Sequence, residues 1–191
     1  MKKLLIVSAI LLSSNLIYAQ NQTLSVSYGV YSTDQFIFAF SSIFSSIASE
    51  MAGNGTYETS GVFGPLAVSY HRILKSNERF SFGGSLVFDH AKFVDKDTKN
   101  NSHSFNAFTL APEGKFKYLQ PQSKFNVYGL LGAGLTVISY ENFTDSKTGA
   151  IPHFNFQVTP IGLEYGSDVK GFLELGIGYK GFVSGGIAYN F

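Results

Sequence analysis

The feature that most constrains this chain is an alternation of apolar residues with small or polar residues, which recurs in one segment after another. In the last segment, 183–191, the apolar or glycine positions are Val183, Gly185, Ile187, Tyr189 and Phe191, and the positions between them are Ser184, Gly186, Ala188 and Asn190. Successive side chains of a β-strand point to opposite faces. The period of two therefore predicts a strand with one apolar face and one small or polar face.

The same period recurs upstream and predicts about eight strands, a common number for a small barrel. In 173–180 the period places Tyr179 on the apolar face and Lys180 on the other. In the segment that begins at Phe154, Pro160 breaks the phase of the alternation, which predicts a β-bulge. The segment 125–137 is less regular because both of its faces are apolar or glycine. The remaining alternating segments are 24–30, 66–71, 80–89, 108–118 and 154–158.

The connections between these segments are alternately short and long. This is expected for a barrel that has short turns at one end and longer loops at the other. Short polar connections are expected at 75–79, 120–124 and 166–170. Longer polar stretches at 95–103 and 141–152 are expected to be loops at the other end, where 179–181 is the exception, an unusually tight last loop. The pattern predicts a closed antiparallel barrel with both ends of the chain on the side of the short turns.

One segment has the period of a helix instead. Ser32 and Gln35 are spaced as a capping box, and apolar residues follow at intervals of three and four up to Met51. We expect an amphipathic helix over 34–51 in the first long loop. It could lie at a lipid interface or cap the mouth of the barrel.

The composition indicates which face of the barrel meets which solvent. Only 14% of the residues are charged, and the chain has 19 Phe, 11 Tyr and 20 Gly but no Trp; a soluble domain carries about 25% charged residues. A soluble barrel turns its apolar face inward and needs a charged exterior. Here the second face is mostly Ser, Gly, Asn, Ala and Thr, which suits a narrow interior. We therefore predict that the apolar face is outward, toward lipid, with aromatic girdles near the strand ends.

The N-terminal residues resemble a targeting segment. Lys2 and Lys3 precede an apolar run, 4–12, that is too short to span a membrane, and Ala19 offers a cleavage site. We expect a signal peptide at 1–19 and a single barrel domain at 20–191. Removing two of the 14 basic residues leaves 12 against 13 acidic residues, a balance that gives no footprint for nucleic acid. The absence of cysteine excludes disulfides and a lipoprotein anchor.

The last strand carries a family resemblance. Ala188-Tyr189-Asn190-Phe191 resembles the closing-strand signature of outer-membrane β-barrel proteins, and the glycine-rich strands around 153–162 and 178–181 are similar to small barrel proteins of the Bacteroidetes type. The resemblance implies an eight-stranded barrel in a Gram-negative outer membrane, in contact with its lipid and lipopolysaccharide. It also implies that the barrel-assembly machinery recognises the last strand, so the expected assembly signal is Val183, Ile187, Tyr189 and Phe191.

Several charged residues fall on faces predicted to point inward. These candidates are His71, Glu113, Lys115, Lys117 and Glu174. They could form a proton or ion path, or a paired network that fills the lumen, because charges removed from water require partners. An eight-stranded barrel has almost no open channel, and the network is therefore the favoured interpretation.

Catalysis is the alternative function. Some eight-stranded barrels are lipid A-modifying enzymes that use a His with Ser and an acidic residue near the outer leaflet. His103 lies between Ser102 and Ser104, near Asp95 and Asp97, and His153 is a second candidate; the spacing matches no known motif. The expected function is non-enzymatic, in envelope integrity or surface interaction, without cofactor or metal, since 95–101 lacks the glycine and distal Glu of a calcium loop. The sequence names no surface partner.

Overall fold

Eight antiparallel strands close into one barrel. The computed structural model describes residues 22–37, 39–40, 57–95, 102–120, 123–142 and 147–191. The strands are β1 (Gln22–Val30), β2 (Tyr57–Leu74), β3 (Asn77–Asp95), β4 (Ser102–Lys117), β5 (Phe125–Asn142), β6 (Lys147–Gly166), β7 (Val169–Gly178) and β8 (Val183–Asn190). Each strand pairs with its neighbours in the chain, and β8 returns to pair with β1. The predicted closed barrel of eight antiparallel strands is confirmed; the segment 1–19 lies outside the described residues.

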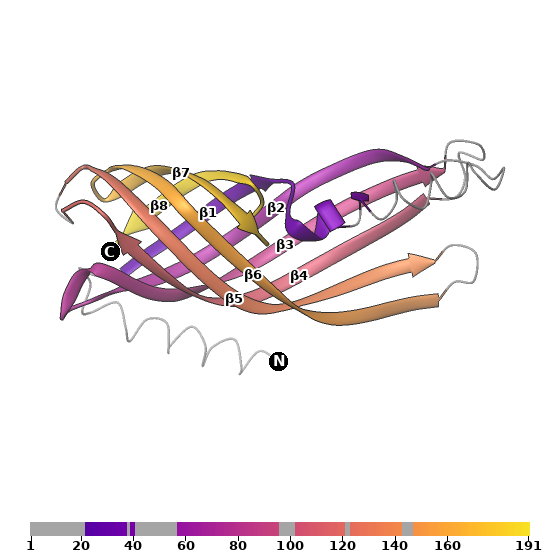
Figure 1. Cartoon of the computed structure of the whole chain (residues 1–191), viewed down its shortest axis with the longest axis horizontal. Helices are drawn as coiled ribbons and strands as arrows, with labels where there is room; N and C mark the ends of the chain where they lie inside the picture. The colour runs from indigo at the N-terminus through magenta and orange to yellow at the C-terminus, as the bar shows by residue number, and fades with distance from the viewer. Residues whose placement is uncertain (1–21, 38, 41–56, 96–101, 121–122, 143–146) are drawn as a thin grey trace, which may run out of the picture.

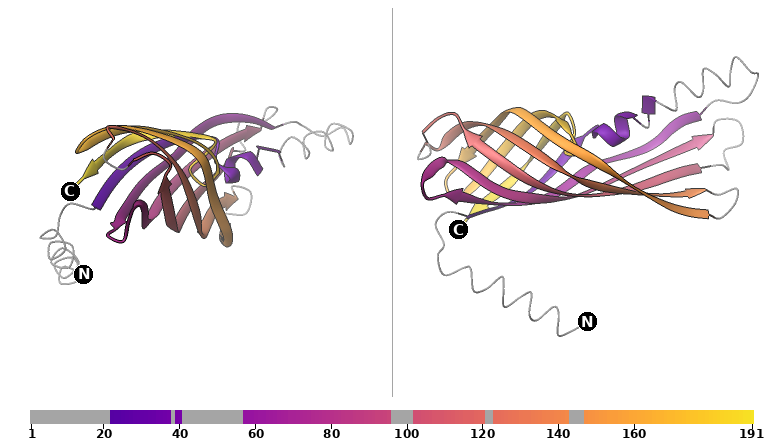
Figure 2. Two further views of the ribbon diagram at one scale, coloured as in Figure 1. Left: turned by 60° about the vertical axis from the view of Figure 1, so that its left-hand side comes forward. Right: turned by 60° about the horizontal axis from the view of Figure 1, so that its bottom comes forward.

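The strands differ greatly in length, which makes the barrel asymmetric. Strands β2 to β6 have 16 to 20 residues, whereas β1, β7 and β8 have 8 to 10. The barrel is therefore closed at the end that holds the C-terminus, and β2 to β6 continue beyond it as a curved sheet (Figures 1 and 2). Pro152 lies in the part of β6 beyond its pairing with β7 and lacks the N–H that a further strand would need.

The alternation predicted from the sequence corresponds to the two faces of the wall. On β1, Leu24 and Val26 are 44% and 48% exposed, whereas Ser27, between Val26 and Tyr28, is buried. At Pro160 the pairing of β6 with β7 shifts between Val158 and Ile161, which confirms the predicted bulge. The bulge keeps apolar residues outward on both sides of the break, because the extra residue restores the phase.

Two long loops are shorter than predicted. Strand β5 continues to Asn142 and β6 begins at Lys147, and the pairing includes Glu141 with Thr148, so most of 141–152 is strand. Likewise β3 extends to Asp95 and β4 begins at Ser102. Main-chain hydrogen bonds continue the strand pairing into regions where apolar and polar residues no longer alternate. The prediction rests on that alternation alone, and it therefore ends the strands too early.

A short helical segment follows β1. Residues 33–37 and 39–40 are helical, and the rest of the predicted helix 34–51 lies outside the described residues. The capping box is present: Gln35 N donates to Ser32 Oγ at 3.1 Å, and Ser32 N donates to Gln35 Oε1 at 3.3 Å. In the part of the chain that the structure describes, no helix has the length and apolar character to cross a membrane.

Candidate functional site

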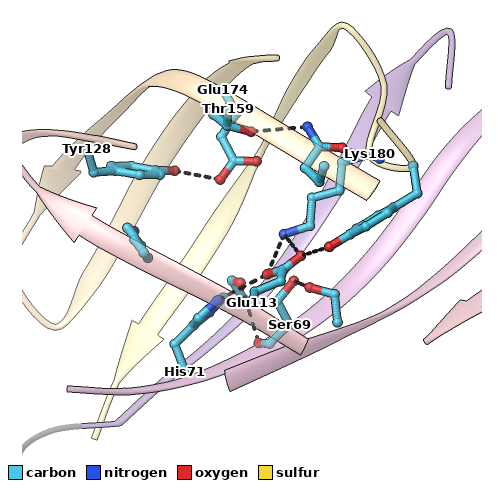
Figure 3. A network of polar contacts seen from close by, with 12 residues as sticks. Ser69, His71, Glu113, Tyr128, Thr159, Glu174 and Lys180 are labelled. Carbon is cyan, nitrogen blue, oxygen red and sulfur yellow. Dashed lines mark hydrogen bonds and ion pairs between the residues drawn. The ribbon is translucent and has the colours of Figure 1, made fainter. Parts of the chain in front are cut away.

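The centre of the barrel interior is a cluster around Glu113 of β4. Lys180 Nζ lies 2.8 Å from Glu113 Oε1 and 2.9 Å from Oε2, so the ammonium group bridges both oxygens (Figure 3). His71 Nε2 is 3.1 Å from Oε2, without the alignment of a hydrogen bond. The side chains of Glu113 and Lys180 are 0% and 4% exposed. A carboxylate and an ammonium group so far from water are tolerated only because each partners the other.

Tyr179 completes this cluster, contrary to the prediction that placed it on the outward face. Its hydroxyl donates to Glu113 Oε1 at 2.8 Å, and the residue is 1% exposed. The alternation ends at Gly178, whose φ of +148° is open to glycine but rarely to other residues. Gly132 on β5 leaves the space for the ring, since a Cβ there would lie 2.0 Å from the Tyr179 hydroxyl.

A second carboxylate, Glu174 of β7, lies beside this cluster. It accepts a hydrogen bond from Tyr128 at 2.8 Å and one from Ser184 Oγ at 3.1 Å. Tyr128 is 1% exposed, and Lys115 Nζ lies 3.5 Å from the centre of its ring, a cation–π contact. Glu174 is therefore held by neutral hydroxyl groups, one of which, on Tyr128, lies beside Lys115.

A third carboxylate lies nearer the closed end of the barrel and collects three lysines. Glu164 of β6 contacts Lys115 at 2.7 Å, Lys170 at 3.2 Å and Lys117 at 3.4 Å. These lysine side chains are 9% to 15% exposed, more than Lys180. Three lysines against one carboxylate leave an excess of positive charge. This excess is tolerated because the lysines have some access to water, which screens it.

The mouth of the barrel is filled by the start of the helical segment. Ser32 and Gln35, 1% and 2% exposed, both donate to the carboxylate of Asp89 on β3. Asp34 accepts from Asn155 Nδ2 at 2.9 Å and lies 2.9 Å from His153 Nε2, both on β6. Burial raises the pKa of Asp34 above its ordinary value, an effect that the nearby His153 opposes. These contacts hold the segment between two walls of the barrel.

The histidines predicted for catalysis are not brought together. His153 bonds Asp34, and among the described residues no serine or threonine hydroxyl is its partner. His103 lies in β4, where its backbone pairs with Phe93, and its side chain is outside what the structure describes.

A small cavity lies beside the central cluster. The cavity between the central cluster and the lysines has a volume of about 30 Å³ and is lined by residues that include His71, Lys115 and Glu174. A space of that size holds a water molecule or two. Within the described ranges, no group of three His, Asp or Glu side chains is placed to hold a metal ion.

The structure places the sequence candidates on the faces expected for them. His71, Glu113, Lys117 and Glu174 are all under 8% exposed, and Lys115 also points inward, to Glu164. Val183, Ile187 and Tyr189 are 41% to 65% exposed on the outer face of β8, and the Phe191 ring stacks 5.9 Å from that of Tyr189.

Sequence reasoning missed several interior residues. Tyr128 lies in the segment where both faces looked apolar, Glu164 follows the bulge, and Tyr179 follows Gly178. The alternation places Lys180 on the inward face, as the structure has it, but the predicted network does not include it. The signal that could have found them is local: a glycine or proline that interrupts the period, after which the faces need to be reassigned. Comparison of this chain with protein-family models, with characterised proteins and with solved structures finds no match.

Proposed function

We propose that this chain is an integral outer-membrane β-barrel protein, exported by a cleaved signal peptide, with a structural, envelope-integrity or surface-interaction role and no open pore. The observation that carries the proposal is the inverted distribution of polarity. The wall exposes large apolar side chains, among them Leu86, Leu110 and Leu135 at 62% to 63%, while the charged side chains described above are buried inside. Soluble monomers rarely expose contiguous apolar patches larger than a few hundred Å².

The height of the apolar wall supports this placement. The outward row that begins at Phe108 on β4 ends at Tyr118, the residue directly after the strand. Its length matches the roughly 9–11 residues of a tilted strand that crosses a membrane. The next outward position before Phe108 is polar, since Asn106 Oδ1 lies 2.8 Å from His90 Nδ1 on the neighbouring strand. An apolar belt of this height, bounded by a polar position, fits the hydrocarbon layer of a membrane better than an extended interface with another protein.

The filled lumen supports a role other than conduction. Lys180 lies against Glu113 and Gln157 in the centre, and Gln35 closes the mouth. An ion crossing the barrel would have to separate these pairs in a medium of low dielectric constant. We therefore assign the protein a role that depends on its wall and its exposed end, with outer-membrane lipid and lipopolysaccharide as its neighbours.

The experiment that tests membrane insertion is electrophoresis of the protein extracted from the outer-membrane fraction, with and without boiling. A folded barrel retains its compact shape in detergent and migrates differently from the boiled chain. Recovery of the protein in the soluble periplasmic fraction, with equal mobility of both samples, would overturn the proposal. Steady conductance in planar bilayers would overturn the closed lumen alone.

The proposed assembly signal has a matched test. Phe191 exchanges two backbone hydrogen bonds with Gln22, at 3.0 and 3.1 Å, where β8 meets β1. Deleting Phe191 should reduce the amount of folded barrel in the membrane because it removes both the pairing and the outward ring. Ala188→Gly, an inward change on the same strand at a buried side chain without a hydrogen-bonding group, is the control; equal loss in both variants would contradict an outward recognition row.

A further inference from the structure

The outer wall contains a groove that the barrel itself does not fill. Its volume is about 480 Å³, and it crosses the outward faces of β3 to β6. The walls are mainly apolar side chains: Phe80, Phe116, Tyr118, Leu131, Val158 and Pro160. It is therefore a depression within the apolar belt, in the half of the wall nearer the C-terminus and the short turns.

The groove exists because glycines form its floor. At Gly114 an added Cβ would meet only the Phe80 ring, at 3.3 Å, so the position is otherwise open. At Gly129 a Cβ would lie 2.3 Å from the Tyr118 hydroxyl. Without these side chains the wall is thin where β4 and β5 pair, and the aromatic rings of the neighbouring positions stand around the depression.

A backbone carbonyl at the bulge already has a hydrogen-bond donor. Tyr118 donates its hydroxyl to the carbonyl oxygen of Pro160 at 2.9 Å. An occupant therefore needs no hydrogen-bonding group at this point, and a purely apolar occupant costs no unpaired carbonyl.

We propose that this groove holds one acyl chain of a phospholipid from the leaflet nearer the short turns; the proposal rests on the membrane placement proposed above. The groove is continuous with the apolar wall, so the surrounding lipid enters it without crossing a polar surface. An acyl chain in the groove contacts protein atoms on three sides, whereas a chain on a flat wall contacts them on one side. The dispersion attraction is the sum of many such contacts and is therefore stronger in the groove. A flexible chain can adopt the shape of the groove.

A second copy of the barrel is a poorer occupant. Closed dimers usually bring the same surface of two subunits together, which would set one groove opposite the other and leave both unfilled. The acyl chain is therefore the occupant we commit to, and a dimer becomes one outcome of the test.

The absence of tryptophan allows a direct measurement. Phe116→Trp puts a fluorophore in the groove, and Leu86→Trp puts one on the open wall outside it. In vesicles of phosphatidylethanolamine and phosphatidylglycerol with brominated acyl chains, both should be quenched. In detergent micelles with increasing brominated phospholipid, the groove position should be half-quenched at about a threefold lower lipid fraction, because the second acyl chain keeps a phospholipid beside the groove after the first chain leaves it, an advantage that a single-chain detergent lacks.

Two glycines supply a matched pair of variants. Gly114→Leu fills the groove, whereas Gly171→Leu adds the same side chain on β7 at a position with nothing within 4 Å. The first change should remove the difference between the two fluorophores, and the second should leave it unchanged. Heat-modifiable mobility of both variants shows that each has folded.

The outcomes separate the two proposals. Absence of quenching at both positions in vesicles would overturn the membrane placement and the groove with it. Quenching at both positions in vesicles with identical curves in micelles would overturn the groove alone. A cross-linked dimer in which the groove fluorophore of Phe116→Trp is shielded from brominated lipid would assign the groove to a second copy and overturn the acyl chain.

Discussion

Two buried carboxylates, Glu113 and Glu164, are equally inaccessible but have opposite surroundings. Each is 4% exposed. Among the described residues, Glu113 contacts one lysine, Lys180, together with Tyr179 and His71, whereas Glu164 contacts three lysines. The Glu113–Lys180 pair is balanced in charge and shielded from water; the Glu164 cluster carries excess positive charge, and its lysines are more exposed than Lys180.

The difference shows in which part of the barrel each charged group needs a partner of opposite charge. In the centre, an unpaired ion would lose its hydration without compensation. Near the end of the barrel, solvent and counterions screen the charges that exceed the pairing. We therefore expect the two clusters to respond differently to the same substitution, from a large loss at Glu113 to a negligible one at Lys117.

Glu113→Gln should cause the largest loss. It leaves the Lys180 ammonium group buried without its carboxylate, which costs about 3–5 kcal/mol of folding free energy. The measurement is the urea midpoint of the folded, heat-modifiable band in lipid vesicles. The double variant Glu113→Gln with Lys180→Met should recover part of the loss, because no charge is then stranded. A single variant within about 1 kcal/mol of the original protein would contradict a dry central pair.

Tyr179→Phe should destabilise the barrel by about 1.5–3 kcal/mol, because it removes a hydrogen bond to a charged group and leaves the rest of the cluster in place. The same urea titration measures it. Tyr165→Phe is the control, since Tyr165 is 67% exposed on the outer wall and should change stability little. Equal effects of the two changes would mean that the hydrogen bond from Tyr179 to Glu113 does not contribute to stability.

Glu164→Gln should cost less than Glu113→Gln and should depend on salt. Three lysines then repel one another near water, and raising the ionic strength should reduce the loss, since salt screens accessible charges. The loss caused by Glu113→Gln should hardly change with salt. Titrations at about 0.05 and 0.5 M salt compare them; equal salt dependence would contradict the difference in water access between the clusters.

The architecture could be predicted because alternation reports directly which face of a strand a residue occupies. It assigns Leu110 and Glu113 to the faces on which they lie, and the break at Pro160 coincides with the bulge. The predicted lumen residues also lie inside. The sequence could not show which distant residues the barrel brings together. Glu113 of β4 and Lys180, in the turn after β7, are 67 residues apart in the chain but form an ion pair.

Local chain reversals explain the remaining error. Tyr179 follows the apolar rows of β7 in sequence, but Gly178 turns the chain so that the ring enters the lumen. A period of two carries no information about such a turn. Register is likewise set by pairing along the whole strand, and so the partner of a buried charge depends on distant residues that no local pattern records.

The smallest expected effect uses one substitution in both clusters. Lys117 is the most distant of the three lysines from Glu164, at 3.4 Å, and Lys117→Met replaces a surplus buried charge with an apolar side chain of similar length. Its effect should lie within about 0.5 kcal/mol of zero, because Glu164 keeps Lys115 and Lys170. Lys180→Met removes the lysine that Glu113 contacts in the described part of the chain and should cost about 3 kcal/mol or more. If Lys117→Met were as damaging as Lys180→Met, the three lysines would have to be individually required, and the contrast between a balanced centre and a screened end would fail.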